Sequence, residues 1–427
     1  MKRLIIELIM FAGLAAWCLA QKSPLSGDFR ISVSVSPFTE LETQQGITFT
    51  DGKTIAKNPG ELQRLFDDHG ANEVYARIAT TQKYRIGFGD HSMDRGLERA
   101  RMAQALGLPF NPELGLFNAY GDVRCQPPPD FSDYPQIKVP GVWTSLKLEE
   151  MLKILRSYGA VAAKQILDTG VKVRIWDIGN EVEFGMAGVA VPPLLGGCDD
   201  TAGGKGWYRA ADKVDPEIGK MSIMDLSKLS ETDRIDWLRK HVWSYEAKMF
   251  DAVVEGIRSV DPGARFSTHV SGVTSVLPGQ ALAFYEAMNE EGFQPDELGF
   301  SYYPTSSPNP PDRLQAFKDM ATAVHRALNR PVFIAEFGYP AAKMESGFVW
   351  NYAVNGYPQT PDGQADFIRD LAAWGVKSGV ISGMRPWAPD LATVGWGPMS
   401  FFTLHAKTAT ALTSLDAIRK GLTSASY

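Results

Sequence analysis

The sequence predicts an α/β protein that folds as a single (β/α)8 barrel, a TIM barrel with extended βα loops. Short apolar strand candidates alternate with long amphipathic helix candidates, which is typical of a parallel sheet. Eight such units occur, the number that closes into a barrel. No glycine-rich phosphate turn follows a strand candidate, which argues against a doubly wound open sheet. Although 427 residues could make two or three average domains, barrels often exceed that average and no linker divides the chain.

Each unit has a strand with period-two or continuous apolar character, followed by a helix with period 3.6. The predicted strands are 29–36, 73–79, 108–118, 171–178, 264–270, 297–303, 331–337 and 379–387. The predicted helices are 59–70, 93–107, 145–169, 231–259, 279–291, 311–328, 363–377 and 408–420. The first helix opens with Pro59 and closes with Gly70, as helices commonly do. The third strand is the weakest pattern, because Pro112 interrupts it.

The first twenty residues predict a secretory signal peptide. Lys2 and Arg3 precede an apolar run that contains only one charge, Glu7, and Ala20 is a small residue suited to cleavage. A membrane-spanning anchor is the alternative, but the uninterrupted run from Leu8 to Leu19 is shorter than the ~20 residues that a span needs. We therefore expect residues 1–20 to be removed and residues 21–427 to form one catalytic domain, secreted or periplasmic and free of the membrane.

Composition narrows the classes of function. Hydrophobic residues make up 44% and charged residues 22%, which is ordinary for a globular protein with a large core. The net charge of −6 gives no overall attraction for a polyanion, so we expect no nucleic-acid partner. After signal cleavage two cysteines remain, Cys125 and Cys198, in Pro- and Gly-rich surroundings. In an exported protein they could pair between two loops or remain free thiols, and the sequence leaves both open.

Two glutamates follow strands in sharply non-helical contexts: Glu181 in WDIGNEVEFG and Glu336 in FIAEFGYP. In a barrel the chemistry lies at the carboxyl ends of the strands, and these two strands stand roughly opposite each other. A pair of carboxylates that flank one bond is what glycosidic bond cleavage requires, one as acid and one as nucleophile. A single glutamate at a strand end is more often a salt-bridged rim residue. The pair in two specific contexts favours catalysis.

These contexts resemble the clan A barrel glycoside hydrolases, and more narrowly family 53, the arabinogalactan endo-β-1,4-galactanases. SVSVSPFTELETQQGITFTDG resembles the opening strand of that family, GANEVYARIAT its second strand, STHVSG its fifth and LGFSYYP its sixth, and PDGQADFI resembles the segment before its seventh helix. The similarity extends from about residue 30 to 390. The resemblance implies a retaining hydrolase with Glu181 as general acid/base and Glu336 as nucleophile.

The resemblance also implies roles for residues around the two glutamates. Asn180 would hydrogen-bond the 2-hydroxyl of the substrate. Arg77 would lie beside the nucleophile and keep it ionised. Tyr303, rather than its neighbour Tyr302, would hold Glu336 through its hydroxyl.

Two further residues have structural alternatives. His269 would line the site near the acid/base, and its alternative is a satisfied structural histidine. Trp387, in GMRPWAPD, would form a platform for a sugar ring, and its alternative is packing within the barrel.

The chain departs from the family pattern after the third strand and in the eighth strand, two segments that we expect to affect the choice of substrate. FNAYGDVRCQPPPDF replaces the usual third-strand motif and keeps aromatic and acidic character in Tyr120, Asp122 and Phe131. RPWAPD, with Arg385, replaces the usual eighth-strand motif. The long excursion after the fourth strand, with Cys198, Trp207 and Tyr208, could wall one side of a groove.

We expect a monomer that acts on a polysaccharide or oligosaccharide with no metal and no organic cofactor, because paired carboxylates need neither. Another clan A specificity, on mannan or glucan, is one alternative. A non-catalytic carbohydrate-binding barrel is the other. The presence of both carboxylates with Asn180, Arg77 and Tyr303 argues against loss of activity.

Overall fold

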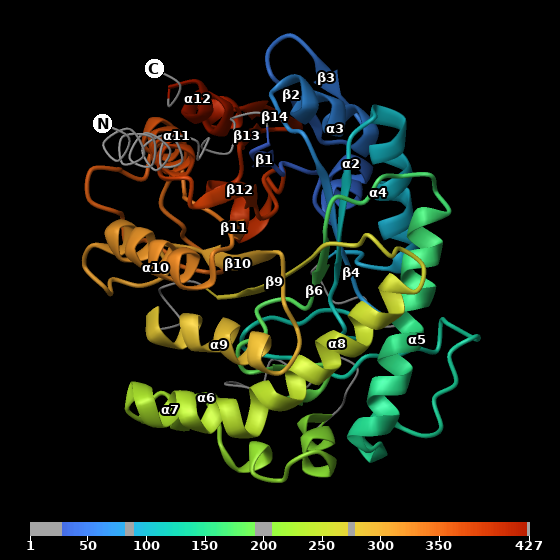
Figure 1. Ribbon diagram of the computed structural model, residues 1–427. Coiled ribbons are helices and arrows are strands. Elements are labelled where there is room, and N and C mark those ends of the chain that lie inside the picture. The colour runs from blue at the N-terminus through green and yellow to red at the C-terminus, as the bar shows by residue number, and fades with distance from the viewer. Residues whose placement is uncertain (1–27, 82–88, 193–206, 272–277, 425–427) are drawn as a thin grey trace, which may run out of the picture.

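The computed structural model describes residues 28–81, 89–192, 207–271 and 278–424. Eight parallel strands form one curled sheet surrounded by helices (Figure 1), which confirms the predicted (β/α)8 barrel. The strands are β1 (Arg30–Ile31), β4 (Val74–Ile78), β5 (Phe110–Leu114), β6 (Trp176–Ile178), β9 (Phe266–Val270), β10 (Glu297–Tyr302), β11 (Val332–Phe337) and β12 (Ile381–Pro386). Each lies within its predicted range. β5 forms despite Pro112, which pairs in register with Ala76 of β4.

The barrel closes between its first and last strands, and the seam lies between the first and second. β1 pairs in parallel with β12, whereas β1 and β4 share no ladder. They are joined instead by Asn72 N, which donates to Ile31 O at 3.0 Å, and by Tyr75 N, which donates to Ser34 Oγ at 2.9 Å. The hydroxyl of Ser34 therefore substitutes for a backbone acceptor at the mouth of the barrel.

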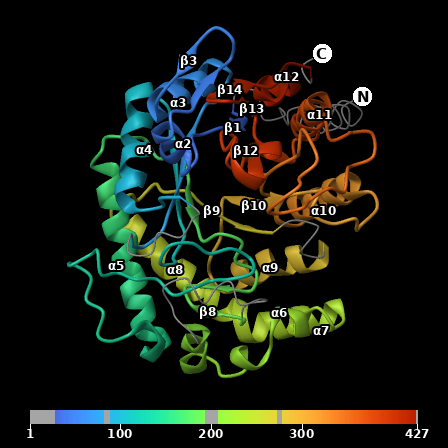
Figure 2. The same cartoon turned by 180° about the vertical axis from the view of Figure 1, so that it is seen from behind.

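The outer helices match the predicted ones closely in the first seven units. They are α3 (Pro59–Asp68), α4 (Met93–Leu106), α5 (Leu148–Leu167), α8 (Ser244–Arg258), α9 (Pro278–Glu290), α10 (Arg313–Leu328) and α11 (Pro361–Ser378). α5 and α8 pack closely through glycines, because a Cβ at Gly159 would lie 2.4 Å from Val253 O and one at Gly256 would lie 2.1 Å from Arg156 O. Figure 2 shows the two helices side by side from behind.

The predicted helix 231–259 is not one continuous α-helix. It consists of α7 (Glu231–Leu238), a π-helical turn labelled η5 (Arg239–Trp243) and α8. Before it, the excursion after β6 contains the hairpin β7 (Gly185–Met186) and β8 (Val189–Ala190), the 3₁₀ turns η3 (Trp207–Lys213) and η4 (Ile218–Lys220), and α6 (Ile223–Leu226). The remaining short helical pieces are α2 (Thr39–Gln44), η1 (Trp143–Ser145) and η6 (Val394–Met399).

The prediction of a last helix over 408–420 was wrong in its first half. Residues Thr408–Ala411 form β14, which is followed by η7 (Thr413–Asp416) and α12 (Ala417–Ser424). β14 pairs with β13 (Phe402–His405) and, in parallel, with β2 (Thr48–Thr50), which pairs with β3 (Ile55–Ala56). The alternation of Thr and Ala suits a strand, and a partner from the other end of the chain decides the outcome. Figure 1 shows these blue and red segments together beside the barrel.

The interior of the barrel is ionic where many barrels are aliphatic. Arg30 on β1 pairs with Glu73 at 2.8 Å and also with Glu297 on β10. Nearer the carboxyl ends of the strands, Arg385 on β12 pairs with Asp177 at 2.8 Å and with Glu113 at 3.2 Å. All six side chains are almost completely buried. Because burying a charge is costly unless the charge is paired, this network favours one arrangement of the inward-facing side chains.

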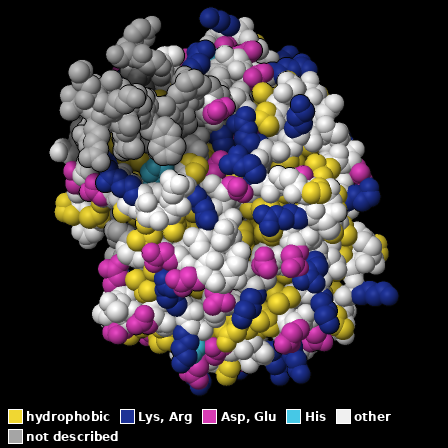
Figure 3. Space-filling model, viewed as in Figure 1, with side chains coloured by type: hydrophobic (Ala, Val, Ile, Leu, Met, Phe, Trp, Pro, Cys, Tyr) yellow, Lys and Arg dark blue, Asp and Glu magenta, His cyan; other side chains and the backbone are white. Residues whose placement is uncertain are grey.

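Basic and acidic side chains are interspersed on the face of the molecule seen in Figure 3. No helix in the described ranges is both long and apolar enough to cross a membrane. The predicted signal peptide lies outside the described residues.

Candidate active site

Glu181 lies just beyond the end of β6, where the backbone bends sharply. Gly179 has φ +76° and Glu181 itself has φ +50°, so two left-handed residues within three positions turn the chain away from the strand. The side chain of Glu181 is buried, and its Oε2 accepts a hydrogen bond from Val123 N at 3.2 Å. The bend thus directs the carboxyl group inward, towards the loop that follows β5.

The environment of Glu181 favours its neutral form. Burial raises its pKa well above the ordinary value, and the charges of Glu336 and Asp122 raise it further. These surroundings favour the protonated form of the carboxyl group, which can donate a proton.

Glu336 lies in β11 and is held by two donors from other strands. Arg77 Nη2, from β4, donates to Oε1, and the hydroxyl of Tyr303, just after β10, donates to Oε2 at 2.8 Å. Both oxygens therefore act as acceptors, the role of an ionised carboxylate. Tyr302 points elsewhere: its ring stacks on Phe317 with centroids 4.1 Å apart, and its hydroxyl donates to a backbone carbonyl.

Arg77 is itself fixed by Glu113, a residue that the sequence analysis did not select. Arg77 Nε donates to Glu113 Oε1, while Glu113 Oε2 accepts from Tyr75 at 2.9 Å and from Arg385 at 3.2 Å. The fully buried Glu113 thus ties the arginine beside Glu336 to the ionic interior of the barrel. A glutamate next to a proline in the weakest strand pattern gave no signal for this position.

Asn180 and His269 lie together beneath the site. Asn180 Oδ1 accepts from Arg77 Nη2 at 2.7 Å and contacts His269 Nε2 at 2.8 Å, while Asn180 Nδ2 donates to Gly121 O at 2.6 Å. Burial lowers the pKa of His269 to about 3, so the ring is neutral and acts as a hydrogen-bond donor to the amide. His269 therefore orients Asn180, and its side chain is 1% exposed.

A cavity of ≈ 370 Å³ opens in front of the two glutamates. Its wall includes both catalytic candidates, several serines and a group of aromatic residues. The lining residues are Tyr120, Asp122, Val123, Arg124, Glu181, Ser271, Ser301, Tyr303, Ser306, Ser307, Glu336, Phe348, Trp350, Trp387 and Trp396. Trp387 is half-buried, and its ring meets that of Trp396 edge-on with centroids 4.6 Å apart. Such flat faces with nearby hydroxyls suit a sugar ring.

The aromatic side was only partly predicted. Trp350, Trp396 and Phe348 come from loops after β11 and β12, where the clustering of aromatic residues in FVWNY and VGWG was the available signal. Of the three residues selected in the segment after β5, Tyr120 and Asp122 line the cavity. Phe131 does not, because it is buried in the core against Tyr158.

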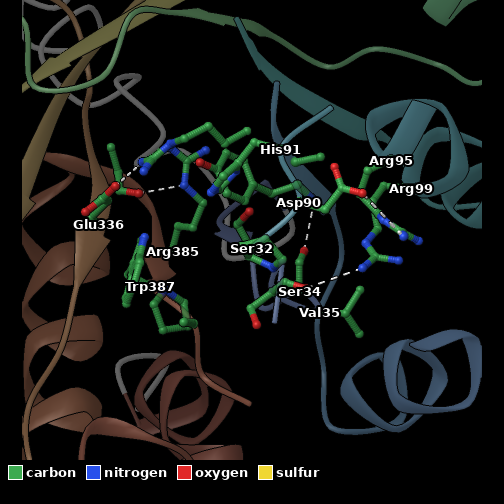
Figure 4. A pocket seen from close by; sticks show the side chains of 18 residues that line it. Ser32, Ser34, Val35, Asp90, His91, Arg95, Arg99, Glu336, Arg385 and Trp387 are labelled. Carbon is green, nitrogen blue, oxygen red and sulfur yellow. Dashed lines mark hydrogen bonds and ion pairs between the residues drawn. The ribbon is translucent and has the colours of Figure 1, made fainter. Parts of the chain in front are cut away.

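A second, small cavity of ≈ 40 Å³ lies on the other side of Glu336, at the seam between β1 and β4. Figure 4 shows Glu336, Arg385 and Trp387 on one side of it and Ser32, Ser34 and Asp90 on the other. The missing ladder at the seam leaves this space directly behind the nucleophile candidate.

Cys125 is disulfide-bonded, which removes the free-thiol alternative for that residue. The other two cysteines, Cys18 and Cys198, lie outside the described residues. The side chains of Trp207 and Tyr208 are likewise not described. Within the described ranges, no group of three His, Cys, Asp or Glu side chains is arranged to hold a metal ion.

The chain is similar to known carbohydrate-active proteins. The model of glycosyl hydrolase family 53 matches residues 222–416, a stretch that includes Glu336 and the last four barrel strands. A probable arabinogalactan endo-β-1,4-galactanase A of Aspergillus tubingensis is 20% identical over 345 residues, which cover 81% of this chain and 80% of that protein.

Two solved structures share the fold. A structure of fungal β-1,4-galactanases has a TM-score of 0.64 at 17% identity, covering 92% of this chain and 99% of that one. The family 53 catalytic domain of Ignisphaera aggregans has a TM-score of 0.66 at 16% identity, covering 94% and 98%. The chain is thus a glycoside hydrolase with a (β/α)8 barrel, and its resemblance to glycoside hydrolase family 53 is confirmed.

Proposed function

We propose that the protein is an exported, retaining β-glycoside hydrolase that cleaves β-1,4-galactan or arabinogalactan within the chain. The observation that carries this proposal is the contrast between two carboxyl groups on one cavity. Glu181 is buried, with its pKa raised well above the ordinary value, whereas Glu336 accepts hydrogen bonds on both oxygens from Arg77 and Tyr303. One acid and one carboxylate on the same cavity are the two groups that double displacement needs.

In the first step, Glu336 attacks the anomeric carbon as the bond to the leaving oxygen breaks and Glu181 transfers its proton to that oxygen. The product is a glycosyl ester of Glu336 and a free hydroxyl on the departing sugar. In the second step, Glu181 takes a proton from water, whose oxygen attacks the anomeric carbon and releases Glu336. Both residues return to their starting states.

The surrounding residues assist in distinct ways. Tyr303 and Arg77 hold the nucleophile and stabilise its charge between turnovers. Asn180 has one amide hydrogen committed to Gly121 O, which leaves the other for the 2-hydroxyl of the substrate. Trp387 offers a ring face for the sugar beside the scissile bond. His269 orients Asn180.

The substrate class is supported by the names of the similar proteins, which include an arabinogalactan endo-β-1,4-galactanase and fungal β-1,4-galactanases. We further propose that residues 1–20 direct export and that residues 21–427 form one monomeric catalytic domain. The departures after the third and eighth strands keep mannan and glucan as alternative substrates.

A reducing-sugar assay on galactan, arabinogalactan, mannan and glucan tests the proposal, with Glu336→Gln as the control for contaminating activity. We expect release from galactan or arabinogalactan by the wild type and none by the variant. Glu336→Ala with added azide should regain turnover on an aryl glycoside and give the α-glycosyl azide. Wild-type turnover by Glu336→Ala would refute the nucleophile, and inactivity on all four glycans would favour a carbohydrate-binding barrel.

A further inference from the structure

A third cavity, of ≈ 180 Å³, adjoins the main one on the side of the catalytic acid. Val123 and Arg124 line both cavities, and Val123 is the residue whose amide contacts Glu181. The rest of the wall comes from the excursion after β6 and from α7, namely Phe184, Ile223, Leu226, Ser227 and Arg234. A polysaccharide bound at the two glutamates could therefore extend into this space.

Arg234 on α7 is unlike the other buried arginines. Within the described ranges no carboxylate oxygen lies within 4.0 Å of its guanidinium group, and its side chain makes no hydrogen bond. The residue is only 9% exposed, and its Nε is completely buried without an acceptor. The other buried arginines of the described chain all donate to acceptors, and they are Arg30, Arg77, Arg99, Arg313 and Arg385.

The rest of the described wall does not neutralise this charge. Arg124 also faces the cavity, but Asp122 already pairs with it at 2.5 Å, and its side chain is 48% exposed. Among the described residues that line the cavity, none is acidic. Largely burying a guanidinium group without a counter-charge is costly, and an anionic ligand that reaches its accessible nitrogens would compensate for that cost.

The other lining residues suit a sugar. Phe184, Ile223 and Leu226 present apolar surface, and Ser227 adds a small polar residue at the edge. At ≈ 180 Å³ the cavity has about half the volume of the main one, which suits a single sugar unit.

We propose that this cavity is a subsite for a uronic acid unit of the polysaccharide, with Arg234 binding the sugar carboxylate. Arg124 stands at the junction, where its half-exposed guanidinium group can contact the hydroxyls of the adjoining sugar. This inference rests on the proposed glycoside hydrolase function and deepens it. The preferred substrate would be a mainly neutral glycan that carries an acidic residue near the cleaved bond.

A test that does not depend on the identity of the neutral glycan uses D-galacturonate alone. We expect tens of millimolar D-galacturonate to raise the Tm of the wild type, whereas its uncharged methyl ester and sodium chloride of equal ionic strength do not. Arg234→Met should lose the shift, and so should Arg234→Gln, which keeps hydrogen-bonding capacity. Lys228→Met is the matched control, since it removes one positive charge beside the cavity from a side chain that is 69% exposed. No shift in the wild type, or equal shifts in wild type and Arg234→Met, would overturn the subsite.

A second arm uses β-1,4-galactotetraose and the same oligosaccharide with its terminal C6 oxidised to a carboxylate. In the inactive Glu336→Gln protein, calorimetry should give about tenfold tighter binding of the oxidised form, a gain that disappears with Arg234→Met. A gain retained in the double variant would contradict the role of Arg234. If neither oligosaccharide binds while galacturonate still shifts the Tm, the galactan assignment fails and the acidic subsite stands.

The unliganded proteins add a readout that separates binding from structure. Because Arg234 has no partner among the described residues, Arg234→Met should keep or raise the Tm of the free protein. A clear loss of Tm would make Arg234 a structural residue and overturn the proposal.

Discussion

The hydroxyl of Tyr303 lies 2.8 Å from Oε2 of Glu336 and donates a hydrogen bond to it. Burial raises the pKa of Tyr303 well above its ordinary value, so the phenol remains a donor across the working range of pH. Its ring is held in turn by Trp350, with centroids 5.0 Å apart. The carboxylate thus receives one oriented neutral donor in addition to the cation of Arg77.

Tyr303→Phe tests the contribution of this donor. A hydrogen bond to a charged group is worth ~1.5–3 kcal/mol, so we expect kcat on an aryl glycoside to fall about tenfold to a hundredfold. Tyr302→Phe is the matched control, because its hydroxyl bonds a backbone carbonyl away from the cavity and its loss should lower Tm more than kcat. Equal kcat values for wild type and Tyr303→Phe would remove Tyr303 from the site.

The pH dependence tests the proton donor. Glu181 must be protonated when the bond breaks, so kcat/KM should decline on the basic side as Glu181 ionises, and its raised pKa moves that decline to higher pH. Glu181→Gln should abolish the basic limb and affect aryl glycosides with good leaving groups far less than polysaccharide. Equal losses on both substrates would contradict the acid role.

Trp387→Ala tests the aromatic wall. Removing a face on which a sugar stacks should cost ~1–3 kcal/mol, and part of the loss should appear in kcat because the contact tightens as the ring flattens. Trp374→Ala, on α11 and outside the lining of the main cavity, controls for the loss of a tryptophan. A change confined to Tm would assign Trp387 to packing alone.

Stability should depend on pH through Glu246 on α8. Both of its carboxyl oxygens are buried and, among the described residues, without a hydrogen-bond partner, and burial raises its pKa well above 4.5, with a further contribution from Glu183. The folded protein keeps this proton while the unfolded chain releases it above about pH 4.5, so stability falls as pH rises, by up to ~1.4 kcal/mol per unit.

Glu246→Leu should therefore raise the free energy of unfolding at pH 7 and flatten its decline from pH 5 to 8, as measured by urea denaturation. Glu255→Leu on the same helix is the control, since that side chain is 49% exposed. An unchanged pH profile in Glu246→Leu would show that Glu246 does not carry the effect.

The sequence predicted the barrel because its strands and outer helices bury continuous faces, and that burial leaves a periodic pattern. The small sheet of β13, β14, β2 and β3 left no such periodic pattern. Its strands β3 and β2 have only two and three residues, and β2 pairs with a strand about 360 positions away. Local propensity alone therefore assigned 408–411 to a helix.

The same distinction holds at the site. Glu181 and Glu336 were found because strand ends are fixed by the fold, and Tyr303 because LGFSYYP resembles the sixth strand of family 53. Arg234 could not be found, because in ETDRIDWL it stands among charged residues and has the pattern of a solvent-exposed position. Whether an arginine has a counter-ion depends on neighbours that only the folded chain supplies.

The parallel pairing of β2 with β14 has a consequence for the order of folding. Thr48 pairs with Thr408, and β1 likewise needs β12, so both strands near the beginning of the chain find their partners only near its end. The contacts that stabilise the first unit can therefore form only when almost the whole polypeptide is present, and forming them requires closing very long loops. The N-terminal unit is therefore the last part of the barrel to be secured, although it is the first to be synthesised.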